Sequence, residues 1–166
     1  MNEFDEDPRV SNGHAELEIL IARPVTEVWA QWIDLGSWIS SHNIEEISEA
    51  RRIVGAITRV SPKVPHVLGD ETAYYHFCKI IKMVPARQYL VKTYSEKGGS
   101  YGVRMMGFDD TRFFAVGDTT RIVFNFFGQS KGTDIADEPG VMNLEGSCVG
   151  MLRNLENLKR IVEGHL

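Results

Sequence analysis

Histidine and tyrosine side chains near one strand-like segment are the groups of this sequence best suited to acid–base chemistry. In the segment from Ala73 to Val84 the residues alternate, so that Tyr74, His76 and Cys78 share one face of a strand and Lys79 lies on the other. Because a lysine rarely occupies a core, we place His76 on the inner face. An imidazole in an apolar surround can transfer protons. A hydrogen-bonded structural histidine is the alternative interpretation.

Tyr101 begins a later strand and is the second candidate for proton transfer. Alternation puts Tyr101 and Met105 on one face and Arg104 on the other, and we expect the first two to point inward. The opposite orientation would place Arg104 inside, where its guanidinium would bind a carboxylate. We therefore predict His76 and Tyr101 as the catalytic pair, with the orientation of this strand left open.

All three tryptophans of the chain fall between Arg23 and Trp38. Trp29 and Trp32 lie about one turn apart on the apolar face of a predicted helix, and such a pair most often belongs to a core. We assign Trp29 to the core and expect Trp32 and Trp38 to border a ligand. Asn143 and Ser147 on the last helix face either a ligand or a close helix contact. The predicted ligand-binding residues are Trp32, Trp38, Tyr74, Met105, Phe124, Phe126, Asn143 and Ser147.

Other groups of reactive residues indicate simpler roles. Asp109 and Asp110, beside Arg112, are typical of a solvated loop or bulge, and we interpret them in this way. The five histidines and two cysteines show neither H-x-x-x-H nor C-x-x-C spacing, so we expect no metal site. The sequence contains no phosphate-binding glycine loop and no Gly-x-Ser-x-Gly motif. We expect chemistry without a cofactor.

Hydrophobic periodicity defines the elements that would hold these residues. Residues 15–21 alternate as a strand, Pro24 suits the first turn of a helix, and Gly36 is expected to end that helix before a short one, capped by Ser37, that bears Trp38. An amphipathic helix follows from about Pro139. Between them, short turns join strand-like segments at residues 51–62, 73–84, 88–95, 101–108, 111–116 and 119–127, which indicates antiparallel pairing.

This order of elements predicts the α+β class: a curved antiparallel sheet wrapped around a long C-terminal helix, with two short helices after the first strand. The 166 residues suit a single domain from residue 14 to 166, preceded by a flexible acidic tail at residues 1–13. The net charge of -5 without clustered basic residues argues against nucleic-acid binding. No secretory signal and no apolar run long enough to span a membrane occur, so we expect a cytoplasmic protein with free thiols.

The stretches ILIARPVTEVWAQWID, IVGAITRV, KMVPARQYLVKTY, AVGDTTRIVFNF and LRNLENLKRIVEG occur in an order that resembles the START-like, or helix-grip, superfamily. More narrowly, they resemble SRPBCC proteins of the polyketide cyclase/dehydrase type. The match runs from about Ala15 to Gly164 and departs from the family pattern at Val84, where an aspartate is common. Each motif alone is weak, and their order carries the resemblance.

The resemblance implies a cavity between the sheet and the long helix, in which members of the superfamily hold sterols, lipids, polyketides or other apolar molecules. The predicted function is binding of an apolar, aromatic or polyketide-like small molecule, with cofactor-free cyclisation, dehydration or lyase chemistry if the protein is an enzyme. A non-catalytic carrier and a protein-interaction module of the heat-shock ATPase activator type are the alternatives, because a fold does not define a function. A homodimer is left open.

Overall fold

The computed structural model describes residues 14–63, 76–94, 104–131 and 144–164, without the side chains of residues 62, 104–106, 128–131 and 144–148. These residues form seven strands and three helices. In chain order the elements are β1 (His14–Ile21), α1 (Val25–Trp32), α2 (Leu35–Trp38), β2 (His42–Glu46), β3 (Ile57–Pro62), β4 (His76–Val84), β5 (Gln88–Tyr94), β6 (Arg104–Val116), β7 (Thr119–Lys131) and α3 (Leu144–Glu163).

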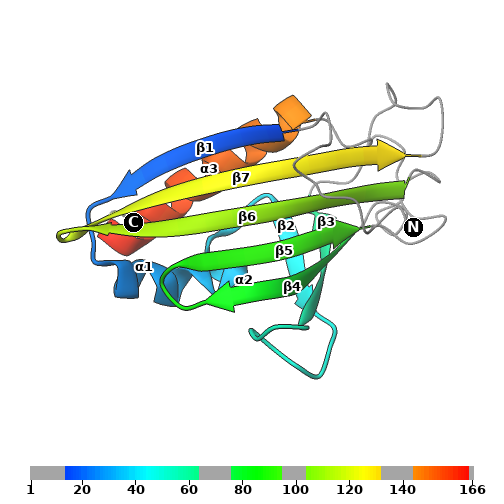
Figure 1. The fold of residues 1–166 in the computed structure, drawn as a ribbon, viewed down its shortest axis with the longest axis horizontal. Helices are drawn as coiled ribbons and strands as arrows, with labels where there is room; N and C mark the ends of the chain where they lie inside the picture. Colours follow the sequence, from blue (N-terminus) through cyan, green and yellow to red (C-terminus); the bar gives the residue numbers. More distant parts are fainter. Residues whose placement is uncertain (1–13, 64–75, 95–103, 132–143, 165–166) are drawn as a thin grey trace.

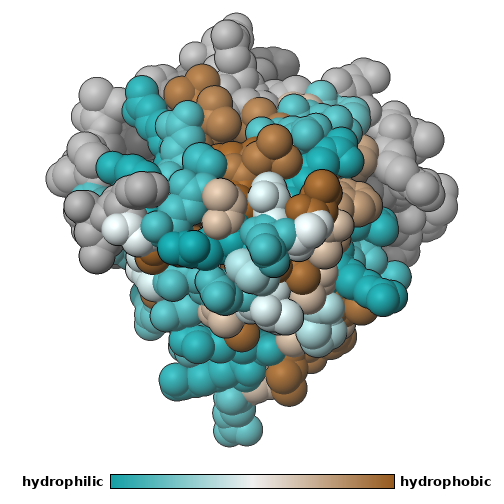
Figure 2. Space-filling model, turned by 90° about the vertical axis from the view of Figure 1, so that its left-hand side faces the viewer, coloured by the Kyte–Doolittle hydropathy of each residue, from teal (hydrophilic) through white to brown (hydrophobic). Residues whose placement is uncertain are grey.

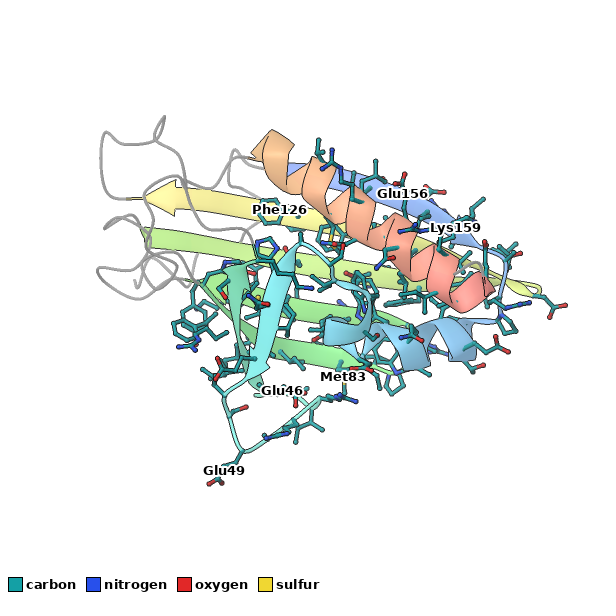
Figure 3. All side chains as sticks on the ribbon, turned by 180° about the vertical axis from the view of Figure 1, so that it is seen from behind. Glu46, Glu49, Met83, Phe126, Glu156 and Lys159 are labelled. Carbon is teal, nitrogen blue, oxygen red and sulfur yellow. The ribbon has the colours of Figure 1, made fainter. Side chains whose placement is uncertain are left out.

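One antiparallel sheet, in the order β1-β7-β6-β5-β4-β3-β2, forms the main layer of the molecule. The chain moves from the edge strand β1 to the opposite edge at β2 and returns strand by strand until β7 pairs with β1. The helix α3 runs along one face of the sheet behind β1 and β7, and α1 and α2 lie beside it (Figure 1; Figure 3 shows the opposite side). We call this covered face the inner face. The predicted α+β class, with a sheet against a long C-terminal helix, is confirmed.

Alternation of apolar and polar residues explains which side of each strand is buried. On β1, Leu17, Ile19 and Ile21 point inward, as predicted, while the residues between them face solvent. Their cross-strand neighbours on β7 include Ile122 and Phe124, which belong to the same hydrophobic core. Because directly opposed residues of an antiparallel pair project to the same side, this register extends the inner face across the sheet.

The boundary between the two short helices differs from the prediction. Gly36 does not end the first helix, because α1 stops at Trp32 and Gly36 lies inside α2. The break occurs at Asp34, the N-cap of α2, whose φ of -92° and ψ of 70° are not helical. Ser37 is likewise inside α2 rather than a cap, and its hydroxyl donates to the Asp34 carbonyl at 2.6 Å.

Three of the strands also differ from the prediction. The expected strand over residues 51–62 begins only at Ile57, because the preceding residues form a turn in which Arg52 has a φ of 57°. The strand β2 was not predicted, since two of its three inward positions, His42 and Glu46, are polar and hide the usual alternation. Farther along, β6 is continuous through Phe108 to Thr111, where a bulge or loop was expected.

The helix α3 covers the inner face through an apolar stripe. Leu155 and Leu158 are both 0% exposed, and Met151 and Val162 pack against the same core. The predicted start of this helix near Pro139 lies outside the described residues. No helix among the described ranges is both long and apolar enough to cross a membrane.

At the end of the molecule that carries the β6–β7 turn, hydrophobic residues on the surface are interrupted by hydrophilic ones (Figure 2).

Truncating the stripe of α3 should show how strongly the fold depends on this contact. We expect Leu155→Ala to lower the free energy of unfolding by about 2–5 kcal/mol, because the substitution leaves a cavity against the sheet. Leu152→Ala is the matched control on the same helix, and it should change the free energy by less than about 0.5 kcal/mol because Leu152 is 38% exposed. Urea unfolding followed by circular dichroism measures both. Equal losses in the two variants would contradict the packing described.

Candidate functional site

An aromatic wall lies where α1 and α2 meet the middle of the sheet. The indoles of Trp32 and Trp38 have ring centroids 4.7 Å apart, and Trp32 meets the rings of Tyr89 and Phe113 edge-on at 5.9 and 5.2 Å. Trp29 also meets Phe113 edge-on, at 5.2 Å. Trp32 and Trp38 are 2% and 1% exposed, so the wall belongs to the core. The indole N–H of Trp38 donates to the Trp32 carbonyl at 3.0 Å, which fixes α2 on α1.

A band of polar side chains crosses the inner face beside this wall. On β4 and β5, Cys78 lies opposite Thr93, with Sγ and Oγ1 3.7 Å apart. On the neighbouring strand β6, Asp109 and Thr111 occupy successive inward positions, and Thr111 lies opposite Tyr89. We call Cys78, Thr93, Asp109 and Thr111 the polar band. Its members come from three strands, so the sheet register alone brings them together.

Among the side chains that the structure describes, three buried polar atoms on or beside this band have no hydrogen-bond partner. They are the indole Nε1 of Trp32, the carboxyl Oδ1 of Asp109 and the hydroxyl Oγ1 of Thr111. Buried polar groups in folded proteins are nearly always satisfied, and each one left alone costs about 1–3 kcal/mol. The three atoms therefore distinguish this part of the inner face from the rest of the described core, whose other buried polar side-chain atoms are paired.

Burial dominates the electrostatics of Asp109. Desolvation raises the pKa of this carboxyl from 3.8 to about 7, because the charged form is disfavoured away from water. The same surroundings, with the Asp109 charge as a smaller contribution, raise the pKa of the Cys78 thiol to about 12 and that of the Tyr89 hydroxyl above its usual range. At neutral pH Cys78 and Tyr89 are therefore uncharged, and Asp109 is the group of this band that changes charge.

The interpretation of the aspartate pair as a solvated loop is wrong for Asp109 and describes only part of Asp110. Both residues lie in the continuous strand β6, on opposite faces. Asp110 is on the outer face, where its carboxylate pairs with Arg112 at 3.0 Å and accepts a hydrogen bond from Gln88 at 3.0 Å. Asp109, one residue earlier, is directed into the core side of the sheet beside Phe126 on β7.

His76 lies at the beginning of β4, on the same side of the strand as Cys78 and opposite Val60 of β3. It is half-buried, and its ring centroid is 6.2 Å from that of His42 on β2. Burial, reinforced by the nearby His42, lowers the pKa of His76 to about 4, and burial also lowers the pKa of His42. Both rings are thus neutral imidazoles at pH 7.

A polar network that the sequence did not reveal connects this histidine pair to α3. The hydroxyl of Ser41 and the ring Nδ1 of His42 are 2.7 Å apart. The Asn154 amide donates to the Ser41 hydroxyl at 3.0 Å and accepts from the Ser40 backbone N–H at 3.1 Å. Asn154 is 5% exposed, so its amide makes its hydrogen bonds inside the protein and not with solvent. A polar residue beside the apolar stripe of α3 was the available signal, but its partners follow only from the fold.

The predicted ligand-binding residues are only partly within the described structure. Phe124 and Phe126 are buried on the inner face, and Trp32 and Trp38 form part of the aromatic wall. Tyr74, Tyr101 and Asn143 lie outside the described residues, and Met105 and Ser147 lie in β6 and α3 without described side chains. The residues that sequence reasoning missed are Asp109, Thr111, Tyr89, Thr93 and His42. Among the residues described, no three His, Cys, Asp or Glu side chains are grouped as a metal site.

Solved structures share this fold at low sequence identity. A conserved protein from Geobacillus kaustophilus matches with a TM-score of 0.66 and 14% identity, over 90% of this chain and 94% of its own. Norcoclaurine synthase from Thalictrum flavum gives 0.63 and 15%, over 92% and 94% of the two chains. The Zhui aromatase/cyclase from Streptomyces sp. R1128 gives 0.62 and 15%, over 90% and 93%.

No protein-family model and no curated protein matches the sequence. The structural likeness covers almost the whole chain in each case, so it concerns the complete sheet and α3 rather than one motif. The chain has the START-like, helix-grip fold of the SRPBCC proteins, as the resemblance predicted.

The buried Asp109 should make stability depend on pH in a specific direction. Its pKa is about 7 in the folded state, above the ordinary 3.8, so the folded state holds a proton that the unfolded state releases between these values. The contribution of Asp109 to the free energy of unfolding is therefore fully present below about pH 4 and is lost as the pH rises to 7 and above.

The variant Asp109→Asn cannot ionise, so its stability relative to the wild type should increase from pH 4 to pH 8. Each unit of pKa shift corresponds to about 1.4 kcal/mol. Urea unfolding of both proteins at a series of pH values measures this difference, from which other titrating groups cancel. If the free energies of unfolding of the two proteins remain parallel over this pH range, Asp109 is hydrated and its pKa is not raised.

Proposed function

We propose that the protein binds an apolar, aromatic or polyketide-like small molecule between the inner face of the sheet and α3, in the cavity that the family resemblance implies. The observation that carries this proposal is the group of three partnerless polar atoms set in an aromatic and aliphatic surround. A binding site for a small molecule typically combines such an apolar lining with a few polar groups that fix its orientation.

The chemistry of the lining favours a flat, largely apolar ligand. Tyr89, Phe113, Phe124 and Phe126 present rings on the inner face, and Trp32 faces two of them from α1. Aromatic rings prefer edge-to-face or offset contacts with other rings, and each such contact adds about 0.5–1.5 kcal/mol beyond the burial of area. The polar band then offers hydrogen bonds to the few polar groups of such a ligand.

The names of two structural neighbours support the same class of ligand. One is an aromatase/cyclase, and another is norcoclaurine synthase in complex with a transition-state analogue. At 15% identity these proteins share the fold, and their activities support the proposal by analogy only.

Acid–base catalysis on this ligand is the finer part of the proposal. His76 is half-buried and on the same side of β4 as the polar band, and its neutral ring has a lone pair for a proton at pH 7, while burial disfavours the imidazolium that would form and makes the ring a weak base. Tyr101, its proposed partner, would hold a substrate carbonyl or return the proton. Cyclisation, dehydration and lyase steps each form or break a carbon–carbon or carbon–oxygen bond, and proton transfer to or from the substrate assists each of them. A carrier without catalysis is the alternative, and it would bind the same ligand without turnover.

Removing an aromatic ring from the inner face should weaken binding of a polyketide-like probe. We expect Phe126→Ala to raise the Kd of 1,8-dihydroxyanthraquinone at least about tenfold, since burial of a phenyl ring contributes about 1.5–3 kcal/mol. Phe114→Ala is the matched control, because Phe114 is on the outer face and 45% exposed. Quenching of tryptophan fluorescence measures both, with circular dichroism as the check on folding. Unchanged binding by Phe126→Ala, or equal weakening in both variants, would contradict the proposed location.

The catalytic part is tested by His76→Ala with a substrate found by screening aromatic ketones and polyketide-like thioesters. Loss of general acid–base assistance should lower kcat by about 10²–10⁴. The Kd of the substrate should stay within a few-fold, because the apolar lining remains. Rapid-quench turnover and equilibrium binding separate the two effects. Normal turnover by the variant would leave the carrier function as the better description.

A further inference from the structure

Asp109 and Thr111 are successive inward residues of β6, and each has a buried oxygen without a partner. Along a strand, such residues are about 6.6 Å apart at their Cα atoms, so two oxygens on the same face can contact one ligand atom placed between them. Trp32 contributes a third unsatisfied group from α1. Its ring contacts Tyr89, which lies opposite Thr111, and Phe113, which follows Thr111 on the same face.

We infer that these three residues form a subsite for a phenolic or enolic hydroxyl group of the ligand. The inference depends on the proposed function, because it names the polar group by which the aromatic ligand is recognised. The carboxylate of Asp109 accepts the hydrogen of the ligand hydroxyl. The hydroxyl of Thr111 and the indole N–H of Trp32 are the donors available to the ligand oxygen.

The hydrogen-bonding capacity of the three groups selects this ligand chemistry. A carboxylate only accepts, an indole N–H only donates, and a hydroxyl does both. A ligand hydroxyl satisfies all three types, since it offers one hydrogen and two lone pairs. An ammonium group would satisfy Asp109 but would present further hydrogens to the N–H of Trp32. An ether or ketone would satisfy the donors but leave the carboxylate unpaired.

The titration of the neighbouring groups supports the same assignment. Asp109 ionises near pH 7, so above this pH it is the stronger acceptor. Among the described groups nearby, Cys78 and Tyr89 stay protonated, because burial raises the pKa of each. His76, with a pKa of about 4, stays neutral from pH 5.5 to 8, and a phenol with a pKa of about 10 does so too. His42 and Glu46 on β2 also face this side of the sheet, and both are retained in Asp109→Leu, so a pH dependence of phenol affinity that this variant loses reports on Asp109.

Three probes with the same aromatic body separate the candidate head groups: 2-naphthol, 2-methoxynaphthalene and 2-naphthylmethylamine. For the wild-type protein at pH 8 we expect 2-naphthol to bind about tenfold or more tightly than 2-methoxynaphthalene, because hydrogen bonds to charged groups contribute about 1.5–3 kcal/mol. The affinity for 2-naphthol should rise severalfold from pH 5.5 to pH 8. The affinity for 2-methoxynaphthalene should not change in that direction.

The variants Asp109→Leu and Thr111→Val remove the oxygens while keeping the approximate shape of the side chains. Both replace a buried, unsatisfied polar group by an apolar one, so the folded state should be retained. Each should reduce the preference for 2-naphthol over 2-methoxynaphthalene, and Asp109→Leu should also remove its pH dependence. Isothermal titration calorimetry gives the affinities, and Asp110→Leu on the outer face is the control that should keep the preference.

The outcomes distinguish this inference from the proposed function. Binding of both neutral probes with no preference, in wild type and variants alike, would overturn the hydroxyl subsite and leave the aromatic binding site standing. A water molecule that permanently satisfies the three atoms would have the same consequence. Tightest binding of 2-naphthylmethylamine, lost in Asp109→Leu, would overturn it in favour of a cation site. Absence of binding by all three probes would count against the proposed function and the subsite together.

Discussion

Burial of one face of a seven-stranded sheet under α3 is the constraint on which the rest of this structure depends. A sheet that presents Ile19, Val91 and Ile122 on one side cannot leave that side in water, and α3 supplies Leu155 and Leu158 to cover it. The short helices complete the cover, since Trp32 and Trp38 pack on each other and on the sheet. The hydrophobic effect thus fixes the positions of all three helices.

The same burial gives the polar side chains of the inner face their chemical character. The register holds Asp109 on the inner face, because β6 pairs without interruption with β5 and β7, and a shift by one residue would turn all of its neighbours to the opposite face. The carboxyl therefore remains in an apolar environment, where its pKa is raised to about 7. Buried ionisable groups with strongly shifted pKa values occur mainly at functional sites, although their burial costs free energy of folding. This is the reason for proposing a ligand beside the unpaired groups.

The sequence predicted the architecture because local periodicity carries most of that information. Alternation placed Leu17, Ile19 and Ile21 on the inner face, and the lysine at position 79 was enough to orient His76 correctly. The strand β2 was missed, since a strand with His42 and Glu46 on its inner side lacks the hydrophobic pattern. The long helix was recognised from its stripe, and the family motifs supplied the order of the elements.

The site was harder to predict because it depends on register. Two adjacent aspartates are most often exposed, and nothing local shows that Asp109 lies between β5 and β7 in the middle of a sheet. The relation of Thr111 to Tyr89 and of Asn154 to Ser41 joins residues far apart in the chain. Such pairings follow from the order of strands and the position of α3, which a single sequence does not specify residue by residue.

We propose that a small aromatic molecule binds against the inner face of the sheet. Nuclear Overhauser effects between a bound naphthol and the methyl groups of the labelled protein test it most directly, because they report distances of a few ångströms. We expect cross-peaks to inner-face methyl groups such as those of Thr111, Val91 and Ile122. Cross-peaks confined to exposed methyl groups such as those of Leu20, Ile81 and Val116 would contradict the account.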